Sequence, residues 1–101
     1  MPSKKNSDIP LYYKGRPLVR SGDEIYFGSP EDSHMIYIQI LSYTGEGEDE
    51  VVDRVYVRLL SNSPDLTLQA RTIKESEKVG IWGALDIGIV WLDRALAESG
   101  S

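Results

Sequence analysis

Two stretches in the middle of the chain, residues 35–44 and 51–60, alternate apolar and polar side chains with a two-residue period. Successive side chains of a β-strand point to opposite faces, so this period predicts two long strands that are each apolar on one face. The residues on these apolar faces are Ile36, Ile38 and Ile40 in the first stretch and Val55, Val57 and Leu59 in the second. Because a turn-rich acidic segment, 45–50, joins the two stretches, we predict that they form the central hairpin of an antiparallel sheet.

Shorter strand-like runs lie on both sides of this hairpin. Residues 11–13, 17–19 and 24–27 are rich in aromatic and β-branched side chains and are separated by glycine-containing turns. Pro17 has no backbone N–H to donate to a neighbouring strand, which indicates the edge of the sheet. After the hairpin, residues 66–73 alternate again and predict one further strand. The sheet should then contain about five to six strands in a meander-like order.

The spacing of apolar residues changes near the C-terminus. Over residues 77–98 they recur at three- and four-residue steps, which is the spacing of one face of a helix, and Ser76 is the predicted N-cap. The stripe that should cover the sheet consists of Ile81, Leu85, Ile89, Leu92 and Leu96. Strands followed by one helix predict an α+β fold, with an antiparallel β-sheet packed against a single C-terminal α-helix.

The length and composition are those of one folded domain. The chain has 101 residues, of which 41% are hydrophobic and 27% charged, and these values suffice for one core. Residues 1–9 are polar and lack periodicity, so we expect a flexible tail there and a single domain over residues 10–99.

The charge and the absence of cysteine argue against several classes of protein. A net charge of −5 repels the phosphate backbone and disfavours nucleic acid as a partner. Without cysteine there is no disulfide framework and no thiolate for metal or redox chemistry. No apolar run reaches the ~20 residues of a membrane span. We therefore expect a cytoplasmic protein that has no cofactor and does not associate with membranes.

The predicted helix is apolar over a wider arc than a core requires. The arc spans roughly 200°, whereas ~100° is enough to cover a sheet. The residues that widen it and that we assign to an interface are Gly80, Ala84, Ile87, Gly88, Trp91 and Ala95. The small residues are spaced four apart, which favours close approach of a second copy in a homodimer. The alternative is that they let the helix lie low on a twisted sheet, while the first strands or the tail cover the remainder.

The opposite sheet face gathers aromatic and cationic side chains. They are Tyr37, Gln39, Tyr43, Arg54, Tyr56, Arg58, Gln69 and Arg71. Planar aromatic groups and bidentate donors can hold an anion, and the residues that we assign to such a ligand site are Tyr37, Gln39, Tyr56, Arg58 and Arg71. The alternative is a solvated sheet face with cross-strand Tyr–Arg pairs.

The sequence contains no recognisable catalytic or metal-binding motif. The single histidine, His34, is near Glu31 and Asp32, but no nucleophile elbow or cysteine accompanies it. The carboxylates of segment 45–50 lack the order of a calcium loop, and Asp86 and Asp93 are merely on one side of the helix. We expect no metal site and no enzymatic activity.

These observations favour a non-catalytic cytoplasmic module for protein–protein interaction that forms a homodimer through its C-terminal helix. The alternative is a small protein that binds an anionic ligand on the Tyr/Arg-rich sheet face.

Overall fold

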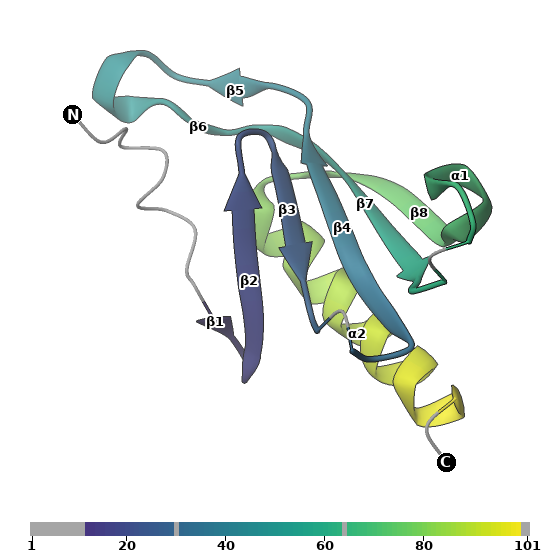
Figure 1. The fold of residues 1–101 in the computed structure, drawn as a ribbon. Helices are drawn as coiled ribbons and strands as arrows, with labels where there is room; N and C mark the ends of the chain where they lie inside the picture. Colours follow the sequence, from purple (N-terminus) through teal and green to yellow (C-terminus); the bar gives the residue numbers. More distant parts are fainter. Residues whose placement is uncertain (1–11, 30, 64, 100–101) are drawn as a thin grey trace.

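A computed structural model describes residues 12–29, 31–63 and 65–99, and it confirms the α+β fold. One six-stranded antiparallel sheet has a long helix on one face (Figure 1). Its strands are β1 (Tyr12–Tyr13), β2 (Arg16–Ser21), β3 (Glu24–Phe27), β4 (His34–Ile40), β7 (Arg54–Ser61) and β8 (Thr72–Val79). They lie side by side in the order β1-β2-β3-β4-β7-β8, which is the predicted meander. The predicted tail, residues 1–9, lies outside the described residues.

Strands β4 and β7 form the central hairpin that the two-residue period predicts. Ile36 lies opposite Leu59 and Ile38 opposite Val57, so their apolar faces coincide. The hairpin is interrupted beyond Ile40, where two successive backbone N–H groups, of residues 41 and 42, both donate to the carbonyl of Arg54. This irregularity separates a two-stranded extension, β5 (Tyr43–Thr44) and β6 (Val51–Val52), from the main sheet. The two predicted strands are therefore each divided.

Residues 66–73 do not form the predicted strand. Residues Leu68–Arg71 form a short helix, α1, and β8 begins directly after it. The hydroxyl of Thr67 accepts a hydrogen bond from the backbone N–H of Ala70 at 3.2 Å. This cap satisfies a free donor of the first helical turn and stabilises a helix where alternation alone predicted extended chain.

The long helix, α2, extends over Ile81–Ser99, so the predicted start near residue 77 is wrong. Ser76 is not the N-cap, because it lies in β8 opposite Val57. Gly80 separates the two elements: its φ of +85° lies in the left-handed region, which glycine adopts without strain. Its N–H donates to the carbonyl of Asp53 at 2.6 Å, which holds this turn against the sheet.

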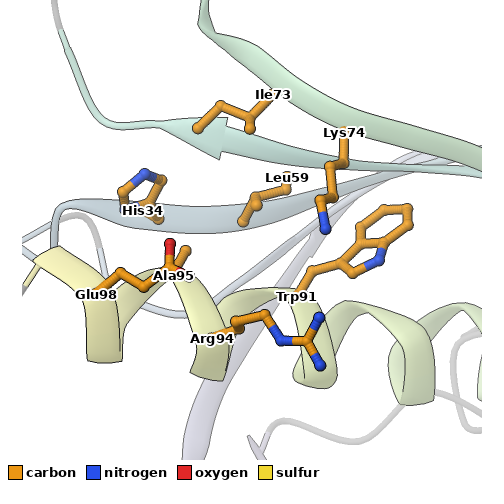
Figure 2. A pocket seen from close by; sticks show the side chains of 8 residues that line it. All are labelled: His34, Leu59, Ile73, Lys74, Trp91, Arg94, Ala95 and Glu98. Atoms are coloured by element: carbon orange, nitrogen blue, oxygen red, sulfur yellow. The ribbon is translucent and has the colours of Figure 1, made fainter.

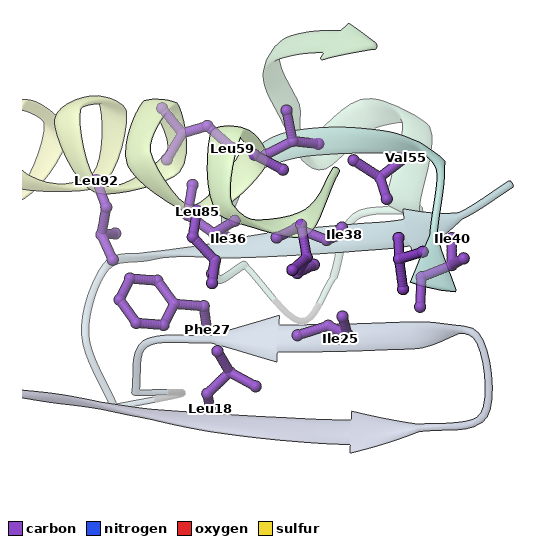
Figure 3. Packing of buried hydrophobic residues seen from close by; sticks show 14 residues of the cluster. Leu18, Ile25, Phe27, Ile36, Ile38, Ile40, Val55, Leu59, Leu85 and Leu92 are labelled. Carbon is purple, nitrogen blue, oxygen red and sulfur yellow. The ribbon is translucent and has the colours of Figure 1, made fainter. Parts of the chain in front are cut away.

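The core lies between α2 and the helix-facing side of the sheet. Leu85 and Leu92 of the helix are completely buried, and Figure 3 shows them above Phe27 and Ile36 of the strands. Leu18 of β2 and Ile25 of β3 extend the core along the helix-facing side of the sheet. Ile81, Leu85 and Leu92 of the predicted stripe are buried against the sheet, whereas Ile89 and Leu96 are only partly buried.

Candidate functional site

The predicted interface residues of α2 do not form one exposed surface. Ala84 is fully buried, and a Cβ atom added to Gly88 would lie 3.2 Å from Cγ2 of Ile36. Both small residues therefore face the protein's own sheet and allow the helix to approach it closely. Ile87, Trp91 and Ala95 are partly buried at the margin of the core, and Gly80 precedes the helix. Homodimerisation remains a prediction, but Ala84 and Gly88 are not accessible to a second copy.

The first strands cover one side of α2. The ring of Tyr13 packs against that of Trp82, with ring centroids 5.6 Å apart, and its hydroxyl donates to Oδ1 of Asp86 at 2.9 Å. Arg16 forms an ion pair with Asp93 at 2.6 Å. These contacts give the two helix aspartates a role in holding β1 and β2.

The Tyr-containing part of the outer sheet face is built around Glu24. Tyr37 donates to Oε2 of Glu24 at 3.0 Å and Tyr26 to Oε1 at 3.2 Å, and the two rings lie 5.3 Å apart. Burial, and then the hydrogen bond to Glu24, raise the pKa of Tyr37 to about 12. The phenol groups are therefore neutral donors with an acceptor already in place.

The arginines of the same face are also already occupied. The guanidinium of Arg54 lies 2.7 Å from Glu77, and Arg71 donates to the carbonyl of Ser61 at 2.7 Å. Arg58 lies over the ring of Tyr56 at 5.1 Å. Its Nε atom is 3.4 Å from Glu75, which is ion-pair distance without the geometry of a hydrogen bond.

The register brings most of the predicted ligand set together, because Tyr37 lies opposite Arg58 and Gln39 opposite Tyr56. Arg71 comes from α1 rather than from a strand, but its charge acts on Tyr26, whose ring packs against Tyr37. The sequence reasoning missed that β8 and β3 place Glu75, Glu77 and Glu24 on the same face. These carboxylates lie beside Arg54 and Arg58 and accept from Tyr26 and Tyr37, so the face resembles the solvated alternative more than an anion site.

A pocket of about 310 Å³ lies on the other side of the sheet, between α2 and the edge strand β8 (Figure 2). Its apolar wall consists of Leu59, Ile73, Trp91 and Ala95. Its polar rim consists of His34, Lys74, Arg94 and Glu98. Figure 2 shows the side chain of Lys74 extending from β8 towards the helix, beside the indole of Trp91. α2 packs mainly over β4 and β7, and the pocket lies where the second half of the helix passes the first residues of β8.

The cations at this rim differ from those elsewhere in the protein. In the described part of the chain, Lys74 and Arg94 have no ion pair, hydrogen bond or ring contact. Lys78, on the same side of β8, is the only other such cation among those residues. Each remaining described cation contacts an acid, a carbonyl, a hydroxyl or an aromatic ring: Lys14, Arg16, Arg20, Arg54, Arg58 and Arg71.

The sequence reasoning named Trp91, Ala95 and His34 separately but did not assemble the pocket. The reason is that the patterns predict a strand ending near residue 73 and a helix from about residue 77, so they predict no strand over Thr72–Val79. Lys74, Ser76 and Lys78 nevertheless alternate with Glu75 and Glu77, and this two-residue period of charge was the available signal for a strand.

The remaining candidate groups form no reactive centre within residues 12–29, 31–63 and 65–99. His34 begins β4, and its Nδ1 lies 2.8 Å from the hydroxyl of Ser33. No cluster of His, Asp and Glu in these ranges could hold a metal ion. None of the helices there is long and apolar enough to cross a membrane.

Besides Glu98, the pocket combines an apolar wall with two cations that form no ion pair with a described residue, an arrangement suited to holding a carboxylate-bearing apolar group. This interpretation rests on geometry and charge. No protein-family model matches the chain, and no curated protein or solved structure matches it either.

Proposed function

We propose that this protein is a non-catalytic binding module whose binding site is the pocket between α2 and β8. The partner presents a carboxylate next to an apolar group. The observation that carries the proposal is that Lys74 and Arg94, at the rim of an apolar pocket, have no counterion among the described residues. A cytoplasmic location, expected from the lack of a membrane-spanning apolar run and of cysteine, belongs to the same proposal.

Each half of the pocket recognises one half of such a partner. Leu59, Ile73 and Trp91 can remove an apolar group from water, and the volume of about 310 Å³ is near the lower end of ligand pockets, roughly 300–1,000 Å³. Lys74 and Arg94 can donate charge-assisted hydrogen bonds to a carboxylate. Because both cations are exposed, each contributes only about 0.2–1 kcal/mol.

The outer sheet face is the weaker candidate for an anionic ligand. Arg54 and Arg58 already lie beside Glu77 and Glu75, so an incoming anion would have to displace these carboxylates. The helix-side pocket requires no such displacement within the described structure.

Two small probes of the same shape and opposite charge test the proposal. Phenylbutyrate carries a carboxylate and phenylbutylamine an ammonium group on a similar apolar body. In NMR titrations of isotope-labelled protein, we expect phenylbutyrate to shift the indole N–H signal of Trp91 and phenylbutylamine to shift it far less. Trp82 is the internal reference, because it does not line the pocket.

Matched variants identify the cations involved. Lys74→Gln and Arg94→Gln should each weaken phenylbutyrate binding roughly two- to fivefold. Lys78→Gln is the control, because it removes the same charge from the same strand without lining the pocket. Equal binding of both probes, or no shift of the Trp91 signal with either, would falsify the proposal.

A further inference from the structure

β8 is an edge strand that borders the pocket. It is the last strand of the sheet, contains eight residues and pairs with β7 alone (Figure 1). In the described structure, no strand lies on its other side. An edge strand directs alternate N–H and C=O groups outward, where an extended segment can pair with them. Because Ile73 and Lys74 line the pocket, a segment paired with β8 would lie directly beside it.

The two faces of β8 carry opposite charges, and among the described residues only the negatively charged face has ion-pair partners. Lys74, Ser76 and Lys78 lie opposite Leu59, Val57 and Val55, so they are on the helix side. Glu75 and Glu77 are on the outer side, where Arg58 and Arg54 lie beside them. The strand therefore presents two uncompensated positive charges, both on the side of the pocket.

This charge order disfavours a second copy of β8 as the occupant. A two-fold antiparallel pair centred on Ser76 places Lys74 opposite Lys78 of the partner subunit and Glu75 opposite the partner's Glu77. Centring the pair on Glu75 or Glu77 places two glutamates opposite each other. Like charges directly opposite one another destabilise an antiparallel pair, so the occupant should have a different sequence.

We propose, building on the proposed function, that the partner is an extended peptide segment that adds to β8 as a further antiparallel strand. Two acidic residues four positions apart face Lys78 and Lys74. β8 is irregular beyond Lys74, since Lys74 pairs with Leu59 but Thr72 with Leu60. An apolar residue two positions after the second acid is on the same face of the peptide as the acids and lies beside Ile73 of the pocket. Because the segment runs antiparallel to β8, its order from N- to C-terminus is Glu-x-Ser-x-Glu-x-Leu, with the serine opposite Ser76.

Complementary charge and backbone pairing make separate contributions to this recognition. The acids supply the counterions that Lys74 and Lys78 lack within the described residues, and the backbone supplies hydrogen bonds that do not depend on sequence. The leucine fills the apolar wall formed by Leu59, Ile73 and Trp91. Because the glutamates and the leucine are at alternate positions of the peptide, they share one face, and only this face can lie towards α2.

The test uses a fluorescent synthetic peptide, Thr-Glu-Thr-Ser-Thr-Glu-Thr-Leu-Thr, and measures anisotropy with the full chain. A control peptide has the same composition, but each glutamate is moved one position towards the central serine, so that the two glutamates face Glu77 and Glu75. We expect the first peptide to bind at least about tenfold more tightly than the control. Equal affinities would overturn the proposed register.

Charge exchange and backbone methylation test the two contributions. The Lys74→Glu/Lys78→Glu double variant should no longer bind the glutamate peptide. It should instead bind a peptide in which both glutamates are replaced by lysine. N-methylation of the peptide amides that face β8 should abolish binding, whereas retention of affinity would rule out strand addition.

The outcomes separate this inference from the proposed function. If phenylbutyrate shifts Trp91 but the glutamate peptide does not bind, the peptide inference fails and the pocket remains a ligand site. If neither probe binds, both proposals fail. If the chain alone is a dimer whose β8 amides are protected from hydrogen exchange, a second copy occupies the edge and the peptide inference is overturned.

Discussion

Tyr37 is the most deeply buried tyrosine among the described residues, with only 5% of its surface exposed. The two-residue period correctly places it on the sheet face opposite the helix. It does not reveal the burial, because Tyr26, whose ring packs against Tyr37, belongs to a neighbouring strand, as does Glu24. Single-strand patterns define a side chain's direction, whereas its environment depends on which strands become neighbours.

The raised pKa of Tyr37 predicts a loss of stability in alkali. In the unfolded chain the phenol ionises near pH 10, whereas in the folded protein it stays protonated to about pH 12. Between these values the folded state binds more protons, so the free energy of unfolding falls as pH rises, by up to about 3 kcal/mol from this residue. Urea unfolding at a series of pH values measures the effect.

Two variants isolate this residue from the other tyrosines. Tyr37→Phe should reduce the slope of stability against pH between about pH 10 and 12. Tyr12→Phe is the control, because Tyr12 is 69% exposed, and it should leave the slope unchanged. An unchanged slope in Tyr37→Phe would show that its environment does not favour the neutral phenol.

At the scale of elements, the strands and helices that the sequence predicts correctly are those with one strongly apolar face. β4, β7 and the body of α2 carry clear apolar periods, and they are found where they were expected. β8 alternates lysine and serine with glutamate, so its period is one of charge, and its last residues are adjacent to the apolar start of α2. The boundary depends on the positive φ of Gly80, which composition alone does not indicate.

The two glycines within α2 have different surroundings and should respond differently to substitution. Gly83 has open space around its missing Cβ, so Gly83→Ala should raise the free energy of unfolding by about 0.5–1 kcal/mol through helix propensity. Gly88 lies against Ile36, so Gly88→Val should lower it by at least about 1 kcal/mol through overpacking. Urea unfolding measures both, and equal effects would contradict the close packing at Gly88.

At the scale of the whole molecule, the position of α2 explains why the candidate site differs from the predicted ones. The sequence indicated a wide apolar arc on the helix and a Tyr/Arg face, but Ala84 and Gly88 of the arc face the protein's own sheet. It could not indicate that the second half of α2 passes the first residues of β8, which come after a short helix rather than in the predicted strand. The pocket depends on this arrangement of elements rather than on any local pattern.

A homodimer through α2 now has a definite geometric requirement. It would have to use the face turned away from the sheet, where Trp82 and Val90 are each 49% exposed. Val90→Glu should then shift the mass from light scattering towards the monomer without loss of stability. Gly88→Glu should destabilise the fold instead, because Gly88 faces Ile36. A wild-type chain that is monomeric across a wide concentration range would exclude the dimer.

The β5–β6 extension carries an exposed acidic tip, with Glu46, Glu48 and Asp49, beyond the end of the sheet that lies away from the pocket (Figure 1). The molecule is 46 Å long, whereas mobile ions screen charges beyond ~8 Å at physiological ionic strength. The tip therefore contributes little to the electric field at Lys74 and Arg94. The net charge of −5 therefore does not by itself exclude an acidic partner at Lys74 and Arg94.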